Sequence, residues 1–104
     1  MIVITGSILA RPETLGELWR MAVEHSRRSR AEPGCLFHAV HVDCENPHRL
    51  VFIERWADPA SVKAHFAAPA SDAFAQRAAQ LAAERPMLDI YESARRTVGD
   101  IMAS

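Results

Sequence analysis

The chain has 104 residues, enough for one domain but few enough that a second copy would help to bury its apolar surface. Apolar residues make up 49% and charged residues 24%, a balance that excludes disorder of the whole chain. The net charge of −1, with no long basic run, gives no electrostatic basis for binding nucleic acid. Since no apolar run could span a bilayer and no signal-peptide pattern stands at the start, we expect a cytoplasmic protein.

The two cysteines, Cys35 and Cys44, stand near opposite ends of one predicted strand. At about 3.3 Å per residue they are roughly 30 Å apart, and their odd spacing places them on opposite faces. This geometry argues against an intrachain disulfide. Because neither has the spacing of a metal or redox motif, two separate thiols indicate a reducing compartment.

The N-terminal third predicts a strand and a helix. Residues 2–9 alternate as a strand with both faces partly buried. After a turn over residues 11–14, apolar side chains recur at helical spacing: Leu15, Leu18, Trp19, Ala22 and Val23. His25 falls outside this stripe, so we expect it to be exposed. The helix must end before Pro33-Gly34, because proline disfavours the helical conformation of its predecessor.

The centre of the chain predicts a hairpin that leads into a helix. Residues 35–42 and 50–56 are rich in β-branched and apolar side chains, and the polar segment 43–48 between them favours a turn. Asp58 can cap free backbone N–H groups, and Pro59 suits the first helical position. A helix therefore begins at Pro59.

This helix is expected to stop near Pro69, and a second helical segment to run from about Ser71 to Pro86. The apolar face of the second segment consists of Phe74, Ala78, Leu81 and Ala82. Residues 87–93 then alternate as a last strand.

The order strand, helix, strand, strand, helix, strand is that of a ferredoxin-like βαββαβ unit, an α+β fold with an antiparallel sheet. We expect this domain over residues 1–95, followed by a C-terminal tail over residues 96–104. Helices can cover only one face of the sheet, yet the strand at 50–56 carries apolar side chains at both parities. A second layer must therefore cover the other face.

Four segments in the chain have a distinctive order and spacing. They are Glu32-Pro33-Gly34-Cys35, then Asp43, then Phe52-Ile53-Glu54-Arg55-Trp56, then Ala64-His65-Phe66 followed by Pro69. Over roughly residues 2–93, this pattern resembles the antibiotic biosynthesis monooxygenase family and its quinol monooxygenases. The resemblance implies a homodimer in which two sheets pack face to face as a dimeric α/β-barrel.

The resemblance also implies oxygenation without metal, flavin or another cofactor. In such chemistry an electron-rich phenol, anthrone or quinol is deprotonated, and its anion passes an electron to O₂ before the C–O bond forms. The protein then has to supply a base and a dry pocket. We therefore expect a small aromatic substrate and O₂, and neither a nucleic acid nor a membrane as partner.

His65 is the candidate catalytic base. With Val62 and Phe66 it occupies positions i, i+3 and i+4 of the helix from Pro59, so it should face the sheet and line a pocket. Burial disfavours the cation, so its neutral form is expected at pH 7. On pattern alone, a core histidine bonded to a backbone carbonyl is the simpler interpretation. Members of the resembled family carry a histidine at the matching position in their pocket, which favours a functional role.

Five further residues are predicted to bind substrate: Ser7, His38, Trp56, Phe66 and Phe74. His38 lies on one strand face with apolar neighbours, where the family often has tyrosine, and a structural histidine is the alternative. Trp56 could equally be core or interface, and Glu54 could pair with an arginine instead of acting as a base.

The sequence does not favour a metal site or a phosphate site. No helix carries histidines at i and i+4, no cysteine pair has zinc spacing, and the five histidines are scattered over different elements. His25 and His48 are expected to be solvated. The four glycines are dispersed singly, so no loop is suited to cradle phosphate.

The chain departs from the family at several positions. Where quinol monooxygenases have a second histidine just after the proline that matches Pro69, this chain has Ala70. The haem-degrading branch uses an asparagine, a tryptophan and a histidine, and here Ser7, His65 and Ala75 stand at those places, which disfavours haem degradation. Because no complete catalytic set is present, a non-catalytic dimer that binds a small aromatic ligand is the alternative.

Overall fold

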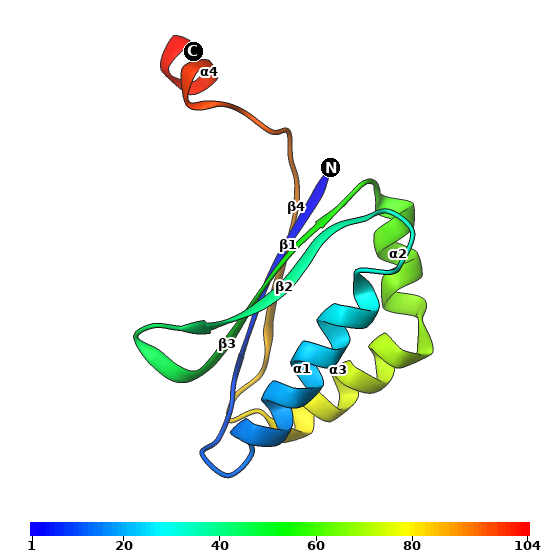
Figure 1. Cartoon of the computed structure of the whole chain (residues 1–104), viewed down its shortest axis with the longest axis vertical. Helices are drawn as coiled ribbons and strands as arrows, with labels where there is room; N and C mark the ends of the chain where they lie inside the picture. The colour runs from blue at the N-terminus through cyan, green and yellow to red at the C-terminus, as the bar shows by residue number, and fades with distance from the viewer.

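The computed structural model describes all 104 residues, and its elements follow the predicted ferredoxin-like order. They are β1 (Ile2–Leu9), α1 (Leu15–Ser29), β2 (Cys35–Asp43), β3 (Asn46–Trp56), α2 (Pro59–Ala67), α3 (Pro69–Leu81), β4 (Met87–Glu92) and α4 (Val98–Ala103). The four strands form one antiparallel sheet in the order β2-β3-β1-β4. Helices α1, α2 and α3 lie together on one side of this sheet, as Figure 1 shows. None of the helices is long and apolar enough to cross a membrane.

The core fills the space between the helices and the sheet, and it is divided into two clusters. The larger cluster joins α1, α3 and the sheet: Ile8, Ala10, Leu18, Ala22, Leu50, Phe52, Ala78, Leu81 and Ala82. The smaller one lies under α2: Ile2, Ile4, Trp56 and Val62. On β3 the buried carboxylate of Glu54 stands between Phe52 of the first cluster and Trp56 of the second. A polar site therefore interrupts the core at this strand.

The junction between β3 and α2 is built from a capping residue and a tight turn. Asp58 Oδ1 accepts a hydrogen bond from the Ser61 backbone N–H at 2.8 Å, and Pro59 occupies the first turn of α2, as predicted. Gly34 packs against this cap with φ of +81°, a conformation that favours glycine. A Cβ at Gly34 would lie 1.9 Å from Ser61 Oγ. The turn that carries Glu32 is thereby held against α2.

Several boundaries differ from those predicted. The hairpin turn is only Cys44-Glu45, because β3 already begins at Asn46 and includes His48. Helix α3 begins at Pro69 and ends at Leu81, well before Pro86. It ends there because the chain turns into the sheet, where Ala82 pairs with Ala10 and the Ala83 N–H bonds the Leu9 carbonyl at 2.7 Å.

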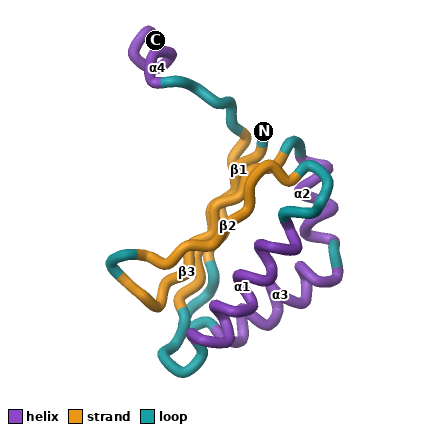
Figure 2. Tube along the Cα trace, viewed as in Figure 1, coloured by secondary structure: helices purple, strands orange, loops and turns teal.

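The C-terminal tail contains a short helix. Residues 98–103 form α4, whose start is closed by a capping box between Thr97 and Asp100. Figures 1 and 2 show the tail leaving the end of β4 and standing apart from the rest of the domain. Its apolar side chains Val98, Ile101 and Met102 are exposed.

The strand-parity argument for the cysteines is wrong, although both thiols are free as expected. Register slips between Cys35 and Phe37, which makes Leu36 an extra residue in β2. Cys35 consequently pairs with Trp56 and packs on the smaller core cluster. Cys44 lies outside β2, exposed in the turn.

Candidate active site

A cavity of about 210 Å³ opens between the sheet and helices α2 and α3, next to the edge strand β4. Most of its wall is apolar, with Phe52, Phe66 and Phe74 among the lining residues. Its polar groups come from His25, His65, Glu54 and Ser71. The cavity thus combines a dry wall with a small set of titratable side chains, an arrangement that is typical of ligand sites.

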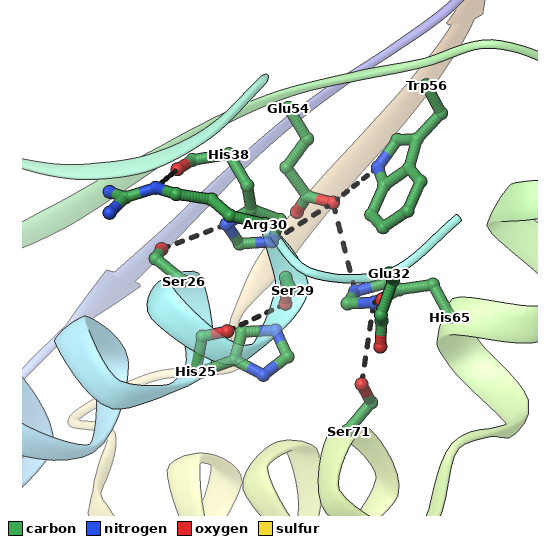
Figure 3. A network of polar contacts seen from close by, with 10 residues as sticks. All are labelled: His25, Ser26, Ser29, Arg30, Glu32, His38, Glu54, Trp56, His65 and Ser71. Carbon is green, nitrogen blue, oxygen red and sulfur yellow. Dashed lines mark hydrogen bonds and ion pairs between the residues drawn. The ribbon is translucent and has the colours of Figure 1, made fainter. Parts of the chain in front are cut away.

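His65 of α2 is buried and lies in this wall, which confirms its predicted inward orientation. Its Nδ1 is 2.6 Å from Glu32 Oε2, and Ser71 Oγ lies 3.5 Å from the same nitrogen. A carboxylate can only accept, so Nδ1 carries the hydrogen and donates it to Glu32. In the neutral ring, Nε2 is therefore an acceptor, and it lies 3.9 Å from Glu54 Oε1. Figure 3 shows this chain of contacts.

Glu54 of β3 is the buried carboxylate at the centre of the site. Its Oε1 accepts a hydrogen bond from Trp56 Nε1 at 2.9 Å and lies 3.4 Å from His38 Nε2. Burial alone would raise the pKa of Glu54, but the contacts with His38, Trp56 and His65 together outweigh it and lower the pKa below its usual value. Glu54 is therefore ionised at neutral pH. It pairs with histidines, and not with an arginine as the sequence suggested.

His38 of β2 is fully enclosed behind the cavity. Its Nδ1 lies 2.9 Å from Ser26 Oγ of α1, and its backbone carbonyl accepts a hydrogen bond from Arg30 Nε at 2.8 Å. The opposite nitrogen, Nε2, is buried without a well-aligned hydrogen bond, although Glu54 is near. Buried polar atoms of this kind are uncommon and call for an explanation.

His25 was expected to be exposed, and this prediction is wrong. Its side chain is buried on α1 and stacks on Phe74, with ring centroids 4.3 Å apart. Burial lowers the pKa of His25 to about 3, and the neighbouring His38 and His65 act in the same direction. The signal was present in the sequence, because His25 follows the buried Leu18 and Ala22 at i+7 and i+3.

The remaining predicted site residues fall into two groups. Ser7, Phe66 and Phe74 border the cavity, although the register of β1 assigns the Ser7 side chain to the face away from the helices. Trp56 and His38 do not border it and stand behind His65 and Glu54, where the Trp56 and His65 rings are 4.6 Å apart. The residues that sequence reasoning did not assign to the site are His25, Glu32 and Ser71.

The fold also overturns the argument that scattered histidines cannot share a site. His25, His38 and His65 come from α1, β2 and α2, and their candidate ligand atoms all lie within 4.8 Å of one another. All three side chains are buried. We refer to these three residues as the histidine cluster.

Comparison with known proteins identifies the family. The sequence model of the antibiotic biosynthesis monooxygenase family matches residues 1–82. Protein sll1783 of Synechocystis is 28% identical over 93 residues; the match covers 89% of this chain but only 63% of that protein's length.

Solved structures share the fold over nearly the whole chain. A candidate antibiotic biosynthesis monooxygenase from Deinococcus radiodurans superposes with a TM-score of 0.88 at 23% identity, over 93% of this chain and 96% of its own. Protein PA3566 of Pseudomonas aeruginosa has a TM-score of 0.80 at 26% identity, over 90% and 94% of the two chains. Since the family model spans most of the sequence and the folds coincide, the chain belongs to the antibiotic biosynthesis monooxygenase family.

Proposed function

We propose that the protein is a monooxygenase that transfers one oxygen atom from O₂ to a small electron-rich aromatic compound of the quinol, anthrone or phenol type, without metal or flavin. One observation carries the proposal: a buried imidazole, His65, is held by a carboxylate at one nitrogen while the ring borders an apolar cavity. The family membership and the fold agree with it. The size of the cavity favours one or two rings, since a cavity of about 150 Å³ is known to hold benzene.

In the proposed reaction His65 is the general base. Its Nδ1 donates to Glu32, so Nε2 has the free lone pair that can take a proton from a substrate hydroxyl or an activated C–H group. The negative charge of Glu32 stabilises the imidazolium that forms, as the carboxylate of a hydrolase triad does. The apolar walls protect the substrate anion from water.

The substrate supplies all the electrons. The deprotonated aromatic passes one electron to O₂, the two radicals combine to form a C–O bond, and the O–O bond then breaks. For an anthrone, one oxygen atom remains as the new carbonyl, and the other leaves as water with the two hydrogen atoms of the substrate methylene. No external reductant is required.

A non-catalytic role as an aromatic-ligand binder is the second candidate. It is favoured by Ala70, which stands where related quinol monooxygenases have a second histidine. His65 is then the only histidine that α2 and the start of α3 contribute to the pocket.

Measuring O₂ consumption with an oxygen electrode distinguishes the monooxygenase from the ligand binder. Protein freed of metal with a chelator should consume O₂ when given a dihydroxynaphthalene or an anthrone, and ¹⁸O₂ should place one labelled atom in the product. Saturable binding of these compounds without O₂ uptake, across a broad panel, would instead support the binder.

We also propose that the chain forms a homodimer through the sheet face opposite the helices. Phe37, Ile53 and Tyr91 are exposed on this face. Large apolar side chains exposed on an open sheet face are typical of a protein interface.

A further inference from the structure

The histidine cluster contains more imidazole rings than the proposed base requires. A single imidazole is enough for general-base catalysis, yet three meet inside the domain with ligand atoms within 4.8 Å of one another. One nitrogen of the cluster, His38 Nε2, is buried without a hydrogen bond, and burying an unpaired polar atom costs free energy. The cluster therefore calls for a function of its own.

In His65 and His38, a hydrogen bond holds Nδ1, the outer nitrogen of the ring. The two Nε2 atoms, the inner nitrogens, therefore converge. His65 Nδ1 donates to Glu32, and His38 Nδ1 is bonded to Ser26 Oγ at 2.9 Å. Both Nε2 atoms face the same oxygen, Glu54 Oε1, at 3.4 Å and 3.9 Å. Metal-binding histidines have this arrangement, because the second nitrogen usually donates to a carboxylate, carbonyl or other oxygen that fixes the ring.

The inner atoms also lack a positive charge between them. With its hydrogen on Nδ1, the neutral form of His65 has an acceptor at Nε2, the ionised Glu54 is an acceptor too, and His38 Nε2 is buried without a hydrogen bond. No lysine or arginine reaches Glu54 Oε1, whose close partners are His38, His65 and the Trp56 N–H. A cation at this point would satisfy all three inner atoms at once.

We propose that His25, His38 and His65 bind one divalent transition-metal ion of the Zn²⁺ or Co²⁺ type, with Glu54 as the fourth ligand. Imidazole nitrogen favours these ions over Mg²⁺ and Ca²⁺, which prefer oxygen. Zinc bonds to nitrogen and oxygen are about 2.0–2.2 Å, so tetrahedral donors stand about 3.4 Å apart. The 3.4 Å and 3.9 Å separations are close to this value, and the 4.8 Å limit requires the rings to move inward by about 1 Å.

This inference goes beyond the proposed function and leads to a distinct consequence. His65 Nε2 cannot coordinate an ion and accept a substrate proton at the same time. Filling the site should therefore stop the proposed oxygenation, so the cluster would make the protein sensitive to transition metals. Binding itself is independent of whether the enzyme reaction exists.

Cobalt titration tests the site without reference to activity. Protein treated with a chelator and then dialysed should bind one Co²⁺ per chain, with the intense visible d–d bands of four-coordinate cobalt, and one equivalent of Zn²⁺ should abolish them. X-ray absorption of the zinc form should show nitrogen and oxygen neighbours with imidazole scattering. Octahedral, weakly absorbing cobalt, or no binding at all, would overturn the proposal even if no variant folds.

Variants locate the ion. His25→Gln, His38→Gln and Glu54→Gln should each weaken Co²⁺ binding by roughly 10- to 100-fold or more. His41→Gln is the matched control, because His41 lies exposed on β2 and belongs to no cluster. Circular dichroism verifies that each variant is folded. Equal affinity in the control and in all folded cluster variants would exclude this site.

Failure of this proposal is distinguishable from failure of the proposed function. Activity in chelator with no metal binding would retain the monooxygenase and reject the metal site. Metal binding without O₂ uptake in chelator would do the reverse.

Discussion

At the scale of single residues, the proposed reaction depends on His65 as its general base. In chelator, His65→Ala should reduce turnover by roughly 10²-fold or more, the usual scale for a general base, while the domain still folds. Steady-state O₂ consumption measures the loss, and thermal unfolding measures the fold. The exposed His41→Ala serves as control and should match the unmodified protein.

A purely structural His65 gives the opposite pattern. Removing its ring would leave Glu32 without its hydrogen-bond partner and Glu54 with only His38 and Trp56 beside it, and would lower the melting temperature. The activity of the surviving folded protein would then be little changed, and His65 would no longer be a candidate base.

His25 makes a prediction about pH. Its pKa is lowered from 6.5 to about 3 by burial first and by His38 and His65 next, while Glu54 opposes this and Arg28 adds to it. Below pH 6.5 the unfolded chain takes up a proton at this position and the folded chain does not. Stability should therefore be full above pH 6.5 and fall as pH drops toward 3, by at most about 1.4 kcal/mol per pH unit.

Urea unfolding at pH 7, 6 and 5, in chelator, measures this effect above the range in which carboxylates titrate. His25→Gln cannot take up the proton, so its stability should change less over these pH values than that of the unmodified protein. Parallel curves for the two proteins would contradict the assignment.

The two histidines also show what local spacing can predict. His65 could be placed inward because Val62 and Phe66 flank it at helical spacing. The burial of His25 could not be predicted, because the inward face of α1 was defined by its apolar residues alone. The buried stripe of α1 includes Ser26 and Ser29, which are polar because they face a polar site inside the core. Apolar periodicity is a poor guide wherever a helix covers such a site.

At the scale of elements, Gly34 should be essential to the junction between β3 and α2. In Gly34→Ala, alanine has to adopt a φ of +81°, and its Cβ would lie 1.9 Å from Ser61 Oγ. We expect the free energy of unfolding to fall by roughly 2–3 kcal/mol. Urea denaturation of the purified variant measures it.

Gly16 is the matched control for this substitution. It lies in α1, and no atom stands within 4 Å of an added Cβ. Gly16→Ala should raise the free energy of unfolding by about 0.5–1 kcal/mol, because alanine is the better helix former. Similar losses for both variants would show that the Gly34 turn has no special geometry.

The elements themselves were predictable where local rules decide them. The alternation of side chains predicts the ends of β1 and β4 to within one residue, and Asp58-Pro59 predicts the start of α2. The sequence predicts that a helix stops near Pro69, although the rule applied to Pro59 also allows a helix to begin there, as α3 does. The end of α3 and the bulge at Leu36 depend on pairing with distant strands, which local sequence does not contain.

At the scale of the whole molecule, the fold and part of the cavity wall could be predicted, but the meeting of the three histidines could not. Strand and helix order specifies the ferredoxin-like unit. The histidine cluster arises because α1, β2 and α2, which are separated in sequence, meet at Glu54. Only the three-dimensional fold brings these residues together.

The helix-free face leads to a prediction about assembly. Ile53 lies in the middle of this face, between Ala39 of β2 and Thr5 of β1, and its side chain is 40% exposed. A stable interface buries about 1,600 Å² in total, and the face of the four-stranded sheet that no helix covers offers a broad surface for it. Light scattering at micromolar concentration should therefore give twice the chain mass of 11.6 kDa.

Substitution of Ile53 tests which face forms the dimer. Ile53→Glu would bury an unpaired carboxylate in each copy, and the cost of desolvating two charges should shift the protein to the monomer mass. Trp19→Glu is the matched control, because Trp19 is a larger exposed apolar residue on α1, in the helical layer on the opposite side of the sheet. It should leave the dimer intact. A monomer mass for the unmodified protein would refute the dimer, and dissociation by Trp19→Glu but not by Ile53→Glu would place the interface on the helices.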